Sequence, residues 1–97
     1  MGASSAAAGS IRRTATIVNQ RGLHARAAAR FVKVAAGFSA DISVAKNGTE
    51  VSGLSIMGLM MLAAGPGTEI EIRASGVDAE AAIAALDALI ANGFDEK

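Results

Sequence analysis

The chain changes its hydrophobic period within a short stretch around position 24, and this change limits the folds open to it. Residues 14–18, Thr-Ala-Thr-Ile-Val, alternate and are rich in β-branched side chains, which is typical of a strand. Downstream, apolar residues recur at positions 25, 28, 29, 32, 35 and 36, the spacing of an amphipathic helix. The sequence therefore predicts a strand over 11–18, a loop over 19–22 and a helix over 25–36 that ends at Gly37.

The only histidine of the chain, His24, lies between this strand and this helix. The free N–H groups of a first helical turn and the positive end of the helix dipole favour a bound anion there, phosphate in particular. An imidazole is a nucleophile near neutral pH, and the guanidinium of Arg26 offers a planar fork of donors to the oxygens of a group on that ring. Isolated histidines more often have a structural or surface role, but this position and Arg26 together favour a ring that carries an anionic group.

The following segments predict more strands. Residues 40–44 alternate as a strand with one buried face, and Asn47-Gly48 is a strong hairpin signal because a tight primed turn needs positive φ at both central positions. Residues 49–52 form the returning strand. Residues 69–74 alternate as a fourth strand, whose charged face is expected to meet water.

Two further helices follow from the pattern. The segment that begins at Ser55 has no single polar face and is ended by Gly65-Pro66-Gly67, so it predicts a short helix with Ser55 near its N-cap and part of its apolar surface exposed. The last helix spans 79–90 with a continuous apolar stripe, and Asp78 is its expected N-cap. Beyond it, Gly93 is expected to close the helix and Phe94 to fold back. The residues of the first helix that are expected to be buried are Ala28, Phe31, Val32 and Ala35.

Two motifs give the chain a family resemblance. They are Gly22-Leu23-His24-Ala25-Arg26 and, in the correct order further along, Ser55-Ile56-Met57-Gly58-Leu59-Met60. Over residues 11–92 the chain resembles the HPr family, the histidine-containing phosphocarriers of the bacterial phosphotransferase system. It departs from that family at Ala27, where proline commonly follows the motif arginine; alanine keeps the helix and loses some rigidity, which affects the expected rate of transfer more than the function.

The resemblance implies a fold and partners. The predicted element order, strand-helix-strand-strand-helix-strand-helix, matches an α+β open-faced β-sandwich of two layers. The resemblance alone implies an antiparallel four-stranded sheet, in the order 1-4-2-3, covered on one face by helices. It also implies that enzyme I donates a phosphoryl group to the protein and that an enzyme IIA accepts it, while HPr kinase/phosphorylase acts on the chain at a serine.

The resemblance implies site residues as well. His24 is the expected phosphoryl acceptor, through Nδ1, and Arg26 is expected to stabilise the transferred group. Ser55 is the expected regulatory phosphosite, although its position alone favours a plain helix cap. The residues expected to contact partner proteins are Leu23, Ala27, Ile56, Met57 and Met60.

Composition narrows the remaining function classes. Nine basic and nine acidic residues balance, so net charge suggests neither nucleic acid nor an anionic membrane as a partner. Cysteine is absent, which excludes disulfides and thiolate metal sites, and no stretch approaches the roughly 20 apolar residues of a membrane span. We expect a flexible leader over residues 1–10, one domain over 11–97, and a monomeric cytoplasmic protein without cofactor or metal.

A stoichiometric carrier fits this sequence better than an independent enzyme. We find no second ionisable group evidently paired with His24 and no glycine loop that would cradle phosphate. Asn19 could hold the backbone near His24 through its amide, but a simple role in the turn is favoured. The alternative function is a regulatory protein-binding module that acts through the Ser55 helix without obligatory phosphotransfer. Sugar transport and nitrogen regulation both remain open as the pathway served.

Overall fold

The structure is a computed structural model that describes residues 10–96 of the chain. Its elements are β1 (Ile11–Thr16), α2 (Ala25–Ala35), β2 (Asp41–Lys46), β3 (Thr49–Ser52), α3 (Ile56–Met61), β4 (Glu69–Ser75), α4 (Ala79–Ala91) and the short 3-10 helix η1 (Gly93–Asp95). The predicted order of strands and helices is confirmed. The expected leader over 1–10 lies, apart from Ser10, outside the described residues.

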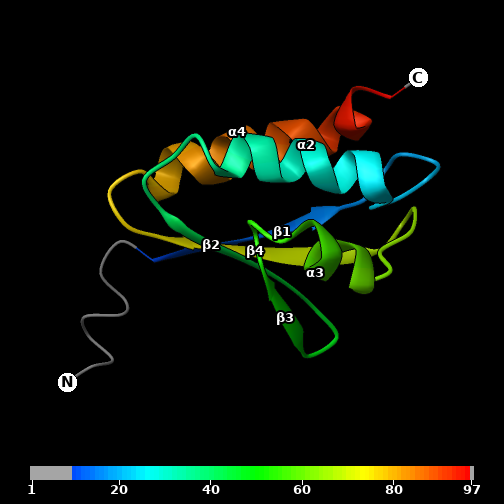
Figure 1. The fold of residues 1–97 in the computed structure, drawn as a ribbon, viewed down its shortest axis with the longest axis horizontal. Helices are drawn as coiled ribbons and strands as arrows, with labels where there is room; N and C mark the ends of the chain where they lie inside the picture. The colour runs from blue at the N-terminus through cyan, green and yellow to red at the C-terminus, as the bar shows by residue number, and fades with distance from the viewer. Residues whose placement is uncertain (1–9, 97) are drawn as a thin grey trace.

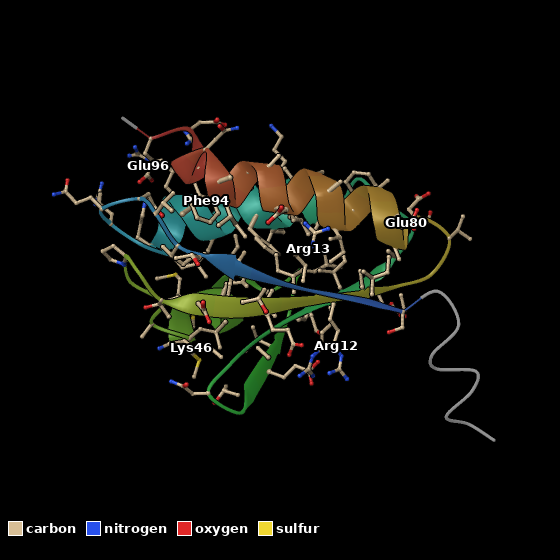
Figure 2. The ribbon with its side chains drawn as sticks, turned by 180° about the vertical axis from the view of Figure 1, so that it is seen from behind. Arg12, Arg13, Lys46, Glu80, Phe94 and Glu96 are labelled. Carbon is tan, nitrogen blue, oxygen red and sulfur yellow. The ribbon has the colours of Figure 1, made fainter. Side chains whose placement is uncertain are left out.

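The strands form one antiparallel sheet in the order β1-β4-β2-β3, as the family resemblance implied. Figure 1 shows α2 and α4 side by side across one face of this sheet, while α3 lies at one end of it, near β3. Figure 2 shows the molecule from behind, with Arg12 directed away from the helices and Arg13 toward them. The fold is therefore an α+β open-faced sandwich of two layers, and the prediction of fold class is confirmed.

A single hydrophobic core fills the space between the sheet and the helices. The apolar stripe of α4 is buried as predicted, except that Leu89 is only partly buried. In α2, the prediction was wrong for Val32, which is half-buried, whereas Ala27 is fully buried. The helix is rotated toward its buried positions Ala27, Ala28, Phe31 and Ala35, which leaves the other small alanines of the periodic pattern at the surface.

The turns follow their residue types. Asn47 and Gly48 have φ values of 50° and 83°, which confirms the predicted tight hairpin. β1 ends at Thr16, earlier than predicted, because Ile17 exchanges its two backbone bonds with Thr68 and Gly67 in the loop before β4. This loop lies beside the strand end that leads to His24.

Asp78 occupies the predicted N-cap position of α4 but does not cap the helix with its side chain. Its carboxylate instead accepts a 2.8 Å hydrogen bond from the backbone N–H of Ser39, in the segment between α2 and β2. The expected capping role was therefore wrong, because a loop from another part of the chain competes for the same carboxylate.

The charged face of β4 is only partly open to water, where the sequence predicted a solvated face. Arg73 lies between two carboxylates, with N–O distances of 2.8 Å to Glu71 and 3.2 Å to Glu50. These bonds raise the pKa of Arg73 above its usual value, with Glu71 as the main cause. Exposed ion pairs of this kind add little stability, so the network mainly sets how these side chains lie across the open face.

Candidate functional site

His24 is the N-cap residue of α2, which places the imidazole between β1 and the helix as predicted. Its backbone is extended, with φ −76° and ψ 179°, and its Nδ1 accepts a 3.3 Å hydrogen bond from the backbone N–H of Arg26. The side chain is 17% exposed, so most of the ring is shielded from solvent and a part remains open to a partner protein. Nδ1 lies at the start of the helix, where free N–H groups and the helix dipole favour negative charge.

The backbone before His24 is held against the segment that follows α3. Gly22 has a φ of +64°, and a Cβ added there would overlap the carbonyl oxygen of Ala64 and lie 2.9 Å from the Cα of Gly65. The next residue, Leu23, donates its N–H to the same Ala64 oxygen over 2.9 Å. Glycine is thus required for both the dihedral angle and the close approach that place His24.

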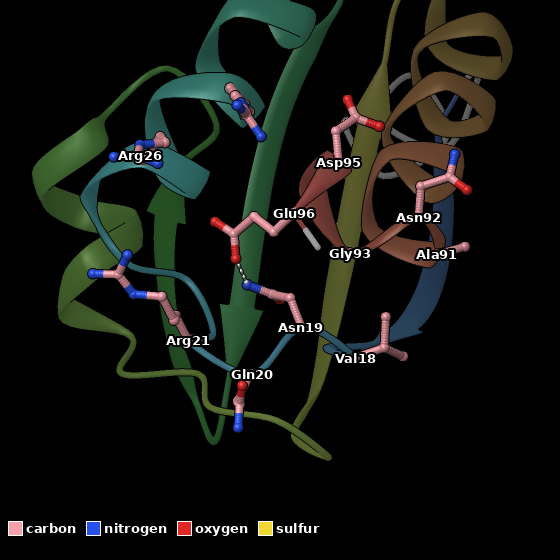
Figure 3. A pocket seen from close by; sticks show the side chains of 11 residues that line it. Val18, Asn19, Gln20, Arg21, Arg26, Ala91, Asn92, Gly93, Asp95 and Glu96 are labelled. Atoms are coloured by element: carbon pink, nitrogen blue, oxygen red, sulfur yellow. Dashed lines mark hydrogen bonds between the residues drawn. The ribbon is translucent and has the colours of Figure 1, made fainter.

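Asn19 supports the same loop from inside. Its side chain is buried, and its Nδ2 donates to the carbonyl of Gly22 at 2.8 Å and to the carboxylate of Glu96 at 3.0 Å, the contact drawn as a dashed line in Figure 3. The favoured prediction of a simple turn residue was wrong. The amide performs the alternative role, which is to hold the backbone that leads to His24.

Glu96 is the site residue that sequence reasoning missed. Its carboxylate contacts Nε2 of His24 as well as Nδ2 of Asn19, so His24 does have an ionisable partner. The hydrogen bonds from Asn19, and then from His24, hold the pKa of Glu96 below its ordinary value. The available signal was Phe94, which the sequence predicted to fold back: it is fully buried with a φ of 57°, and this turn brings Glu96 to the imidazole.

A pocket of about 710 Å³ opens beside this pair. Arg21, Arg26 and Arg30 contribute the positive side of its lining, and Asp95 and Glu96 contribute the negative side (Figure 3). Arg30 donates a hydrogen bond to the carbonyl of Phe94, which ties α2 to η1. The predicted site residue Arg26 is exposed at the mouth of the site, and Arg21 is a further cation there that the sequence analysis did not single out.

Ser55 is the N-cap of α3, as predicted, and its Oγ accepts a 2.9 Å hydrogen bond from the N–H of Gly58. Gly58 suits this contact because a Cβ there would lie 3.0 Å from that Oγ and equally close to Val51. At the other end of the helix, Lys46 donates to the carbonyl of Leu62 at 2.9 Å. The short helix is therefore fixed at both ends and packs against α2.

The outer side of α3 is an exposed apolar surface, as the sequence predicted. We call it the methionine patch, and its members are Ile56, Met57, Met60 and Met61. Met57 and Met61 are 71% and 76% exposed. The other residues that were expected to contact partners, Leu23 and Ala27, are buried. That expectation does not fit the structure, because both side chains pack into the core beneath the site.

Two searches of the described residues are negative. Within residues 10–96, no three His, Asp or Glu side chains lie together in a way that could hold a metal ion. Over the same part of the chain, no helix has the length and apolar character needed to cross a membrane.

Comparison with known proteins identifies the chain. The family model described as PTS HPr component phosphorylation site matches residues 11–92. A phosphocarrier protein HPr from Cupriavidus necator is 45% identical over 86 residues, which cover 89% of this chain and 97% of that protein. A crystal structure of HPr from Thermoanaerobacter tengcongensis superimposes with a TM-score of 0.86 at 44% identity, covering 90% of this chain and 98% of the other. A structure of an HPr dimer from the same organism has a TM-score of 0.72, at 46% identity and with 82% and 92% of the two chains covered.

An open-faced α+β sandwich with a nucleophilic imidazole at a helix N-terminus, beside exposed arginines, defines a small histidine phosphocarrier. The matches to HPr proteins extend over nearly the whole domain and identify its family. The chain belongs to the HPr family, the phosphocarrier proteins of the phosphotransferase system.

Proposed function

We propose that the protein accepts a phosphoryl group on Nδ1 of His24 from phosphorylated enzyme I and passes it to an enzyme IIA. The observation that carries this proposal is the position of Nδ1, which accepts the N–H of Arg26 at the first turn of α2. An accepting Nδ1 has a free electron pair, so the proton of the neutral ring resides on Nε2.

The transfer step follows from that arrangement. The electron pair of Nδ1 forms a bond to phosphorus, the bond from phosphorus to the donor breaks, and its electron pair stays with the donor. The N–H of Arg26 is then available to a phosphoryl oxygen, and the Arg26 guanidinium supplies charged donors to the others. Transfer to enzyme IIA runs the same way in reverse, with the acceptor as nucleophile. In this proposal the protein is a carrier, because it returns to its unphosphorylated state after each transfer. It acts as a monomer in the cytoplasm.

The methionine patch is the proposed docking surface for these partners. The helix that carries the patch, α3, packs against α2, whose N-cap residue is His24. Methionine side chains adapt to surfaces of different shape, which suits a carrier that must bind a donor and an acceptor in turn. The same patch supports the second candidate function, a regulatory binding module that needs no phosphotransfer.

Reconstitution distinguishes the two functions. The protein is incubated with enzyme I and labelled phosphoenolpyruvate, then with an enzyme IIA, beside a related HPr as positive control. We expect one acid-labile, alkali-stable phosphoryl group per chain that is discharged to enzyme IIA, because a phosphoramidate is acid-labile. An unlabelled chain beside a labelled control would favour the binding module.

Arg26→Ala is expected to slow phosphoryl transfer more than a hundredfold. Removal of one charged donor from a transfer site costs roughly 3 kcal/mol of transition-state stabilisation. The resting fold should hardly change, since the side chain is exposed and its backbone N–H remains. Initial rates of phosphorylation and melting temperatures are compared with those of Lys33→Ala, which removes an exposed cation farther along the same helix. Equal rates for the two variants would show that the partner enzymes supply all of the charge stabilisation.

Ser55 is proposed as a second phosphosite, a substrate of HPr kinase/phosphorylase. Its half-buried hydroxyl lies beside the exposed Met57, so a phosphate there would add about two negative charges at the edge of the methionine patch. A partner that covers the patch would then have to desolvate those charges. Phosphorylation of Ser55 should therefore weaken docking of enzyme I while the fold is retained.

We expect Ser55→Asp to lower the initial rate of His24 phosphorylation and Ser55→Ala to leave it near wild type. Ser10→Asp, which adds the same charge at the far end of β1, serves as the control for charge alone. The kinase is also applied to the wild-type chain, and the modified residue is mapped. If Ser55 stays unmodified and all rates agree, Ser55 only caps α3.

A further inference from the structure

We infer that Glu96 is a positioning residue for phosphotransfer, which holds the proton of His24 on Nε2 and faces the positive charge that forms on the ring. This role rests on the proposed function. It is carried by the contacts of one carboxylate, which binds Nε2 of His24 through one oxygen and Nδ2 of Asn19 through the other.

The ring is held at both nitrogens. The N–H of Arg26 points to Nδ1, and the Glu96 carboxylate contacts Nε2. A carboxylate only accepts hydrogen bonds, so it favours the tautomer with its proton on Nε2 and leaves the electron pair of Nδ1 for phosphorus. A ring bound in this way cannot rotate to present the other nitrogen without losing both bonds.

The charge of the ring changes during transfer. When Nδ1 bonds to phosphorus while the proton stays on Nε2, the imidazole becomes a cation, and the electron pair of the broken bond remains on the donor. The Glu96 carboxylate then faces that cation in a setting where both side chains are mostly shielded from water, 17% and 16% exposed. When the phosphoryl group leaves, its bonding electrons return to Nδ1 and the ring is neutral again. A carboxylate at Nε2 therefore favours the cationic form of the phosphorylated ring. From this form the imidazole is a better leaving group than from the neutral form.

The chain fixes Glu96 well enough for this role. Phe94 is fully buried in the core, and the carbonyl of the same residue accepts a hydrogen bond from Arg30 of α2. Asn19 is buried and binds both the loop before His24 and the carboxylate. The neighbouring carboxylate, Asp95, is exposed and makes no hydrogen bond or ion pair with the ring within residues 10–96.

Three variants test the inference. Glu96→Ala removes both acceptor and charge, Glu96→Gln keeps an acceptor for the Nε2 proton without the charge, and Glu80→Gln removes a carboxylate outside the site. Glu80 is exposed in the first turn of α4, at the end of that helix away from Glu96. We expect Glu96→Ala to slow both charging by enzyme I and discharge to enzyme IIA by roughly tenfold or more, the rate equivalent of one hydrogen bond to a charged group. Glu96→Gln should fall between Glu96→Ala and wild type, and Glu80→Gln should match wild type.

A spectroscopic readout separates positioning from a structural effect. In chains with ¹⁵N-labelled histidine, we expect a proton resonance on Nε2 of His24 that exchanges slowly with water in wild type and Glu96→Gln and rapidly in Glu96→Ala. If the wild-type chain is phosphorylated normally and Glu96→Ala is charged and discharged at the same rates, the role of Glu96 is overturned and the proposed function stands. A slowed Glu96→Ala with an unchanged Nε2 resonance would also overturn it, since the effect would then be structural. A wild-type chain that is not phosphorylated would overturn the proposed function and this role with it.

Discussion

His24→Ala is expected to abolish phosphorylation by enzyme I, because the imidazole of His24 is the proposed acceptor and the chain contains no other imidazole. The fold should survive. The variant loses the contact of Nε2 with Glu96 and the bond from the N–H of Arg26 to Nδ1. Loss of a side-chain N-cap alone costs about 1 kcal/mol. For a domain of this size that lowers the melting temperature by roughly 4–8 °C.

His24→Asn is the sharper form of this experiment. Asparagine is a favoured N-cap and can accept the same N–H, but it offers no nucleophilic nitrogen. We expect a melting temperature closer to wild type than that of His24→Ala, and no transfer. The measurement is phosphoryl incorporation from labelled phosphoenolpyruvate, with acid treatment of the product. Label that persists in either variant, or that survives acid in wild type, would contradict the assignment of His24.

The sequence could predict those parts of the fold that depend on residues close to one another in the chain. Alternation gave the strands, the spacing of alanine and leucine gave α4, and Asn47-Gly48 gave the hairpin. His24 could be placed at a helix start for the same reason, since both flanking patterns lie beside it in the chain. The order of the strands could not be predicted in this way, because β1 pairs with β4, which lies far along the chain. That order was implied by the family resemblance alone.

The parts of the site that were missed depend on contacts between distant segments. Glu96 reaches His24 only because Phe94 is buried and turns the chain, and nothing near Glu96 in sequence indicates an imidazole. The sequence around Asn19 predicts a simple turn residue, whereas in the folded chain its amide binds Gly22 and Glu96. Ala27 was expected to contact partner proteins, but it is buried, because a motif does not give the rotation of the helix, which the core determines.

These contacts also explain why the site has more acidic character than the motif suggests. A motif with His24 and Arg26 alone indicates a positively charged site that binds an anion. The folded chain adds Glu96 on the side of Nε2 and leaves the cations Arg21 and Arg26 at the open pocket. The carboxylate of Glu96 therefore faces Nε2, while the backbone N–H of Arg26 points to Nδ1, the proposed phosphoryl acceptor.

Gly22→Ala is expected to be one of the most destabilising single substitutions in the loop that holds His24. An L-residue with a Cβ pays roughly 1–2 kcal/mol for the left-handed backbone conformation that Gly22 adopts at φ +64°. The new Cβ also overlaps the carbonyl oxygen of Ala64, an atom of a backbone that Leu23 itself binds. Relief of that overlap requires the two segments to separate, so the total loss should be about 3 kcal/mol or more.

Gly48→Ala separates the two contributions. Gly48 also has a positive φ, +83°, but a Cβ added there meets nothing within 4 Å, so this variant carries the backbone cost without the overlap. We expect a loss of about 1–2 kcal/mol for Gly48→Ala with unchanged phosphorylation rates, because the hydrogen bonds that hold His24, Asn19 and Glu96 do not involve the β2–β3 hairpin. Free energies of unfolding from urea titrations and initial rates of phosphorylation give both comparisons. Since the bond from Leu23 to Ala64 fixes the residue next to His24, Gly22→Ala should also slow transfer under conditions where it remains folded. Equal stability losses in the two variants would show that the close approach of the two segments does not constrain the site.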